Sequence, residues 1–133
     1  LSSAQPGAYV SLQAYLQPNP DTDAALLELR QSIRERTKLA VTSGYGPRFL
    51  HSTGQLHKGD GGKGLFIQFT SENVQDLPIP NEAGEQASSI SFGVLEAAQA
   101  LGDRQALLDA GRKVIRFHYS SDVPQGLARI NQP

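Results

Sequence analysis

Short apolar, β-rich runs alternate with helical patterns along this chain, and this alternation restricts the fold more than any other feature of the sequence. The runs that we interpret as strands are residues 9–16, 39–42, 64–70 and 114–119. Strands that alternate with helices are typical of a layered domain with a largely parallel sheet. The sequence therefore predicts an α/β fold, a three-layer α/β/α sandwich with a mainly parallel sheet, in which residues 64–70 form a central strand.

The helical patterns lie between these strands. Residues 21–36 are predicted to form a helix that Asp21 or Thr22 caps. Its apolar positions recur at helical spacing and would form an inward stripe of Leu26, Leu29 or Arg30, and Ile33. A further helix is predicted over residues 92–102, and another begins at Asp103, its cap, and ends near Gly111.

The remaining segments are expected to be irregular. The connection of residues 76–88 contains prolines, which exclude regular structure there. One domain is expected over residues 1–133, with residues 1–8 and 123–133 loosely ordered. Because the chain begins with Leu1 and contains no methionine, we expect it to be a fragment of a longer protein.

The composition argues against several classes of partner. With 133 residues, of which 38% are hydrophobic and 19% charged, the chain can bury its own core. A formal net charge of −1 gives no positive field that would attract nucleic acid. No apolar run approaches the roughly 20 residues of a spanning helix, so no membrane partner is expected. The absence of cysteine excludes disulfides and thiolate metal sites and fits a cytoplasmic location.

The segment of residues 44–59 is the densest candidate for chemistry, because it combines glycines, hydroxyls, two histidines and two cations in one strand-to-helix passage. The carboxyl ends of parallel strands are where open α/β sheets bind ligands. In this passage Ser52 and Thr53 are predicted to cap the new helix and to donate to phosphate or sugar hydroxyls. Gln55 offers an acceptor and two donors. His51 has a side chain that can exchange protons near neutral pH.

Residues 48–59, Arg-Phe-Leu-His-Ser-Thr-Gly-Gln-Leu-His-Lys-Gly, resemble the Leu-His-Ser…Gln…Gly stretch in the second sugar-isomerase (SIS) domain of phosphoglucose isomerases. The longer pattern that starts at Gly44 is similar to the isomerase end of fused transaldolase/phosphoglucose isomerase proteins. It continues through residues 65–68, 76–80, 91–93 and 98–103. The resemblance covers roughly residues 9–127.

This resemblance implies an SIS-like fold and an isomerase that interconverts glucose 6-phosphate and fructose 6-phosphate, as in glycolysis and gluconeogenesis. The fusion implies a link to the pentose phosphate pathway. By the same resemblance, His51 matches the histidine that opens the sugar ring, and Gln55 matches a family glutamine. Ser52 and Thr53 would be further substrate contacts, and Arg48 and Lys58 would contact sugar or phosphate.

No metal or organic cofactor is implied. The expected partners are the sugar-phosphate substrate and the remainder of the parent chain, namely a first sugar-isomerase domain and a transaldolase barrel; a homo-oligomer is left open. The family's glutamate base and C-terminal lysine motif are not visible, so the base that moves the proton between carbons is not assigned. It would come from outside this chain or from a residue that the sequence does not identify.

Several residues also have simpler interpretations. His57 is expected to be a solvated helix residue, and His118 a packing or edge residue of the last strand. The glycines of residues 59–64 lack the spacing of a phosphate loop and fit a flexible turn. Two other classes of function remain open: a non-catalytic sugar-phosphate-binding module and a structural module of a larger transaldolase/isomerase.

Overall fold

Four strands pair in the order β2-β1-β3-β6, and all three pairings are parallel. The computed structural model describes residues 4–131. Within it the sheet consists of β1 (Tyr9–Tyr15), β2 (Ala40–Tyr45), β3 (Gly64–Ser71) and β6 (Lys113–Tyr119). The strand of residues 64–70 is an interior strand of the sheet, as the sequence predicts. The predicted fold class, a parallel sheet flanked by helices, is confirmed.

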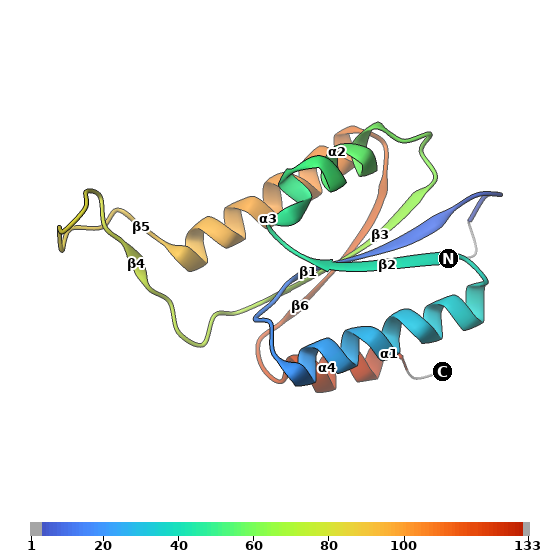
Figure 1. Cartoon of the computed structure of the whole chain (residues 1–133), viewed down its shortest axis with the longest axis horizontal. Helices are drawn as coiled ribbons and strands as arrows, with labels where there is room; N and C mark the ends of the chain where they lie inside the picture. The colour runs from blue at the N-terminus through green and yellow to red at the C-terminus, as the bar shows by residue number, and fades with distance from the viewer. Residues whose placement is uncertain (1–3, 132–133) are drawn as a thin grey trace.

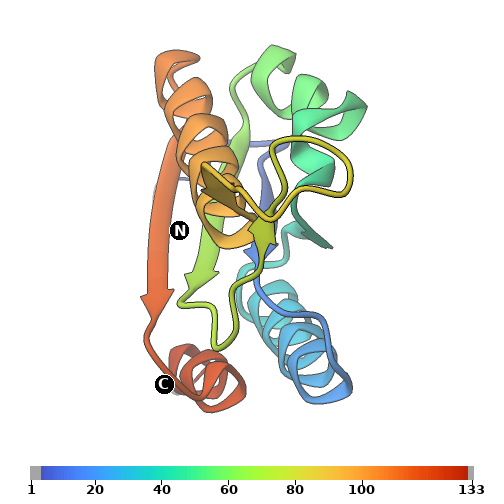
Figure 2. The ribbon, with the colours of Figure 1, turned by 90° about the vertical axis from the view of Figure 1, so that its left-hand side faces the viewer.

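Helices cover both faces of this sheet (Figures 1 and 2). On one face lie α1 (Pro20–Thr37) and α4 (Val123–Ile130). On the other face lie α2 (Ser52–Gly59), which a short 3₁₀ turn η1 (Arg48–Leu50) precedes, and α3 (Phe92–Asp109). Because the strands are parallel, each helix runs back along the sheet. The first turn of α2 therefore lies at the carboxyl edge, where strands of this kind present ligand-binding groups.

The face under α1 and α4 holds the apolar core. Alternate residues of β1 point into it, and the α1 positions Leu26, Leu29 and Ile33 are buried against them, so the predicted stripe is confirmed. Burying each such leucine stabilises the fold by about 1.5–3 kcal/mol. The predicted cap of α1 is wrong by two or three residues: Asn19 Oδ1 accepts the Thr22 N–H at 2.9 Å, and Thr22 is itself buried.

The face under α2 and α3 is polar and aromatic. Ser11, Gln13 and Gln68 are buried there, with at most 1% of each exposed. Gln68 Nε2 donates to the carbonyl oxygen of Ala100 in α3 at 3.0 Å. Nε2 of Gln13 lies 3.4 Å from Nδ1 of His57 in α2, so polar contacts connect this layer to both α2 and α3.

The C-terminal segment corrects one prediction. Residues 123–133 were expected to be loosely ordered, but Val123–Ile130 form α4, and Leu127 is completely buried in the apolar core. Asp122 caps the start of α4, because its carboxylate accepts the Gln125 N–H at 3.1 Å. At the other end of the chain Ala8 is buried. Residues 1–3 and 132–133 of the same prediction lie outside the described residues.

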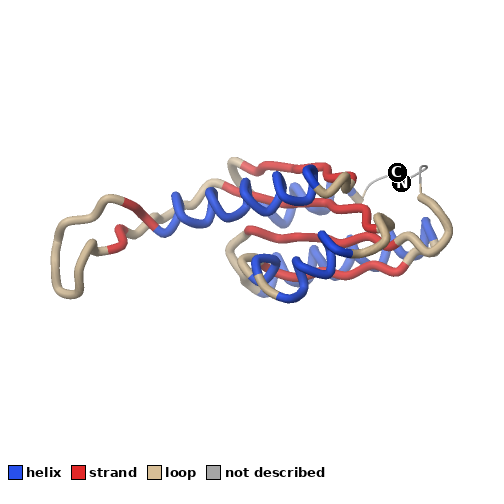
Figure 3. Tube along the Cα trace, turned by 90° about the horizontal axis from the view of Figure 1, so that it is seen from above, coloured by secondary structure: helices blue, strands red, loops and turns tan. Residues whose placement is uncertain are grey.

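Two further predictions, for the connection between β3 and α3 and for α3 itself, are wrong. Its prolines were expected to exclude regular structure, yet β4 (Pro78–Ile79) and β5 (Ile90–Ser91) form a short antiparallel pair. This pair and its loop project beyond the carboxyl end of the sheet (Figures 1 and 3). Asp103 does not cap a separate helix, because α3 is continuous from Phe92 to Asp109 and Asp103 is buried within it.

Among residues 4–131, no helix combines the length and the apolar character that crossing a membrane requires.

Candidate functional site

The segment with the candidate catalytic residues lies at the carboxyl edge, where β2 passes through η1 into α2. His51 is the residue that precedes α2: its backbone carbonyl accepts the Gln55 N–H at 3.1 Å. Its side chain is exposed and makes no capping hydrogen bond to the helix. The imidazole is therefore free to contact a ligand at the first turn of α2.

The other predicted contacts share this first turn. Ser52, Thr53 and Gln55 are all exposed. The expectation that Ser52 or Thr53 caps the helix is wrong, because both are the first residues inside α2 and His51 occupies the cap position. Their side chains are not used to begin the helix, so they remain available to a ligand.

Gly54 determines how closely α2 approaches η1. A side-chain carbon added at this glycine would overlap the carbonyl oxygen of Phe49 and would lie 3.1 Å from its Cα. Phe49 is buried, and its ring lies 6.0 Å from the ring of Tyr15. The placement of His51 therefore depends on a backbone contact that only glycine permits.

The two cations predicted to contact substrate differ in their surroundings. Arg48 is exposed at the start of η1. Lys58 pairs instead with Asp103 of α3, with 2.8 Å between Nζ and Oδ1, and the Asp103 side chain is fully buried. Since the ammonium of Lys58 compensates a buried carboxylate, we assign Lys58 a structural role and keep Arg48 as the candidate phosphate contact of the segment.

His57 corrects the expectation of a solvated residue, because only 4% of it is exposed. Its ring centroid lies 5.1 Å from that of Phe66, and its Nδ1 lies 3.4 Å from Nε2 of Gln13. Burial lowers the pKa of His57, against the opposing charges of Asp103 and Asp60. A neutral imidazole that accepts the Gln13 amide proton fits these surroundings.

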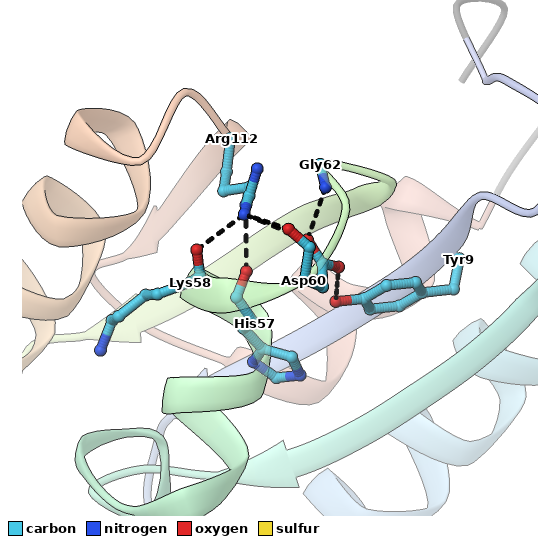
Figure 4. A network of polar contacts seen from close by, with 6 residues as sticks. All are labelled: Tyr9, His57, Lys58, Asp60, Gly62 and Arg112. Atoms are coloured by element: carbon cyan, nitrogen blue, oxygen red, sulfur yellow. Dashed lines mark hydrogen bonds and ion pairs between the residues drawn. The ribbon is translucent and has the colours of Figure 1, made fainter.

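The far end of α2 is held by a network around Arg112 (Figure 4). The guanidinium donates to the carbonyl oxygens of His57, Lys58 and Asp60 at 3.1, 2.6 and 2.8 Å. It also lies 3.2 Å from the Asp60 carboxylate, which accepts the Tyr9 hydroxyl proton at 2.7 Å. Burial tends to raise the pKa of Asp60, but these partners outweigh it and hold that pKa below its usual range. Arg112 thus caps the C-terminal carbonyls of α2.

The glycine-rich segment of residues 59–64 follows directly from this network. The Gly62 N–H donates to Asp60 Oδ1 at 2.8 Å, and Gly62 has a φ of +77°. This geometry is that of a turn into β3, as the simpler interpretation of the sequence expects. The segment lies at the amino end of β3, away from the first turn of α2 (Figure 4).

A cavity of about 640 Å³ lies at the same carboxyl edge, at the ends of β3 and β6 and beside the first half of α3. Residues that line it include Tyr15, Thr70, Asn73, Glu96, Arg116 and His118. None of the six predicted site residues lines it. The cavity was not predicted from the sequence, although the polar run that follows the strand of residues 64–70 was a usable signal.

His118 agrees in part with its expected role as an edge residue. It belongs to β6, an outer strand of the sheet, and its Nδ1 lies 2.9 Å from the hydroxyl of Thr70. Burial raises the pKa of Glu96 in the wall of the cavity. In the part of the chain that the structure describes, no group of three or more histidine, aspartate or glutamate side chains could hold a metal ion.

Together these features define an α/β protein with a parallel sheet, whose exposed polar residues follow the carboxyl ends of its strands. The structure is similar to that of a protein from Thermus thermophilus described as hypothetical protein TT0462, with a TM-score of 0.73 and 18% sequence identity. The match covers 94% of this chain and 34% of that one, so the chain spans about a third of the length of the similar structure. No protein-family model matches the sequence, and no curated protein matches it significantly. At this identity the similarity concerns the fold.

Proposed function

We propose that this chain is part of an aldose–ketose isomerase that interconverts glucose 6-phosphate and fructose 6-phosphate. The observation that carries the proposal is the exposed His51 imidazole at the start of α2, within the segment that resembles phosphoglucose isomerases. Ser52 and Gln55 lie on the same turn and would hold sugar hydroxyls. Thr53 and Arg48 are the further candidate contacts, the latter for phosphate.

In the proposed reaction His51 acts first on the ring. The imidazolium donates a proton to the ring oxygen as the bond from that oxygen to the anomeric carbon breaks. The anomeric hydroxyl gives its proton to water as its oxygen becomes the carbonyl oxygen of the open chain. A separate base next moves a proton between the two adjacent carbons through an enediol.

The carboxylate for that second step is not part of the His51 segment. We propose that the remainder of a parent chain supplies it, along with further phosphate contacts, from a first sugar-isomerase domain. A transaldolase barrel would be a second partner in such a chain.

The test measures binding and turnover in the same samples. Fructose 6-phosphate is titrated into the ¹⁵N-labelled chain, and shifts are expected at residues 48–55 and weakened in His51→Asn and Gln55→Ala. Gln105→Ala is the matched control, because Gln105 is also an exposed helical glutamine and lies in α3. Where turnover is present, His51→Asn should reduce it by about 10²–10⁴.

The same experiment separates the other two classes. Binding at His51 without turnover would favour a non-catalytic sugar-phosphate-binding module. The absence of any shift at residues 48–55 would contradict the proposal and favour a structural module.

A further inference from the structure

The cavity at the ends of β3 and β6 has the size of a small-molecule site. Its volume of about 640 Å³ falls within the range of about 300–1,000 Å³ that is usual for such pockets. It lies at the carboxyl edge of a parallel sheet, the edge at which this architecture binds ligands. Because none of residues 48–58 lines it, the cavity is separate from the His51 segment.

An unpaired hydroxyl group is buried in its wall. Tyr15 is the last residue of β1, and only 3% of it is exposed. Its ring packs against Phe49 and Ala100, yet its hydroxyl oxygen has no hydrogen-bond partner among the described residues. A buried hydroxyl without a hydrogen-bond partner costs about 1–3 kcal/mol of stability. Phenylalanine would fill the same space without this cost, so the presence of tyrosine is explained if a ligand supplies the partner.

A residue with a carboxyl group, Glu96 of α3, lines the same cavity. Burial raises the pKa of Tyr15, and the charges of Asp103 and Glu96 raise it further. Burial raises the pKa of Glu96 itself, so its carboxyl group can be held protonated more readily than an exposed one. Tyr15 and Glu96 together offer both donors and acceptors within a partly desolvated space.

The rest of the wall restricts the ligand. Thr70, Asn73 and Asp76, from β3 and the segment that follows it, add polar groups, whereas Val94, Ala97 and Leu101 of α3 add apolar ones. Hydroxyl and amide partners together with apolar side chains suit a compound that carries both hydroxyl groups and C–H surface.

The charges disfavour an anion in the interior. Three carboxyl groups, Glu72, Asp76 and Glu96, line the cavity, whereas Arg116 of β6 is the one lysine or arginine among its lining residues. His118 lies against Thr70, which occupies one of its ring nitrogens. An uncharged ligand avoids repulsion from the carboxylates.

We propose that this cavity binds a compact, uncharged polyol of monosaccharide size, with the Tyr15 hydroxyl and the Glu96 carboxyl group as its central hydrogen-bond partners. The site is distinct from the one at His51, and the proposal does not depend on the isomerase function.

The test is an NMR titration of the ¹⁵N-labelled chain with fructose, glucose and sorbitol. At least one of them should shift the amide signals of residues 70–73, 93–101 and 116–118. Tyr15→Phe and Glu96→Gln should each weaken that binding about threefold to tenfold, the loss expected for one hydrogen bond.

Tyr119→Phe is the matched control. The Tyr119 hydroxyl is also buried and without a partner among the described residues, but its ring packs at the opposite face of the sheet against Phe69. Removing an unpaired hydroxyl should not harm folding at either position. Polyol binding should therefore weaken in Tyr15→Phe and stay unchanged in Tyr119→Phe.

Three results would overturn the proposal: no shifts in the cavity with any of the three polyols, unchanged affinity in Tyr15→Phe, or an equal loss in Tyr119→Phe. Shifts confined to residues 48–55 would overturn it and leave the isomerase proposal intact. Polyol shifts in the cavity, with no response of residues 48–55 to fructose 6-phosphate, would support it while the isomerase proposal fails.

Discussion

Replacing Gly54 by alanine tests the contact on which the position of His51 depends. An alanine inside a helix normally stabilises it by about 0.5–1 kcal/mol relative to glycine. At Gly54, however, the added carbon would overlap the carbonyl oxygen of Phe49, which is backbone and cannot rotate away. Overpacking of this kind costs about 1–3 kcal/mol, and because backbone must move we expect Gly54→Ala to destabilise the fold by about 3 kcal/mol.

Gly102→Ala supplies the reference. Gly102 also lies inside a helix, α3, but a carbon added there would have no described neighbour within 4 Å. Urea unfolding followed by far-ultraviolet circular dichroism should show a midpoint lower by about 1–2 M for Gly54→Ala and slightly higher for Gly102→Ala. If both variants gained stability alike, α2 would not rest on η1 as described, and the proposed placement of His51 would be wrong.

Three further substitutions test other contacts. Lys58→Met should lower the free energy of unfolding, measured with urea, by about 3 kcal/mol, because it leaves the Asp103 carboxylate buried without its counter-charge. The double variant Lys58→Met/Asp103→Leu should recover part of that loss. Burial lowers the pKa of His57, so the unfolded chain binds a proton at this residue more readily than the folded chain does. The contribution of His57 to stability should therefore be complete above a pH of about 6.5 and fall below it. In thermal melts at a series of pH values, His57→Phe should reduce this dependence of stability on pH. Leu127→Ala should cost about 2–5 kcal/mol in thermal melts, whereas Leu56→Ala, at a side chain that is 65% exposed, should change stability by less than about 0.5 kcal/mol.

The elements with strong periodicity could be predicted from the sequence. Residues 64–70 combine β-branched and aromatic side chains and form the interior strand β3, and Leu26, Leu29 and Ile33 form the buried stripe of α1. These signals are local, since the period of the apolar residues reports which face is buried. The strand-to-helix passage of residues 44–59 was predictable for the same reason, because glycines and hydroxyls mark the end of a strand.

What the sequence concealed depends on contacts between distant residues. His57 is a polar residue on a short helix, and only the fold brings it against Phe66 and Gln13. Asp103 follows a glycine and is a residue type that commonly caps helices, but in the fold it lies inside the continuous helix α3 and pairs with Lys58. The role of His51 was an expectation from resemblance, and the polar run after residues 64–70 was the local signal that could have indicated the cavity beside Glu96.

The two faces of the sheet contribute differently to the candidate site. The apolar face under α1 and α4 supplies non-directional burial. The face under α2 instead relies on directional contacts at both ends of that helix: Arg112 holds the C-terminal carbonyls, and the Gly54 contact with Phe49 fixes the first turn. Hydrogen bonds and close backbone contacts have strict geometric requirements, so these contacts define where α2 lies. His51 therefore occupies the end of a constrained helix while its ring remains exposed, which is the combination that a proton-transfer group at a ligand-binding edge requires.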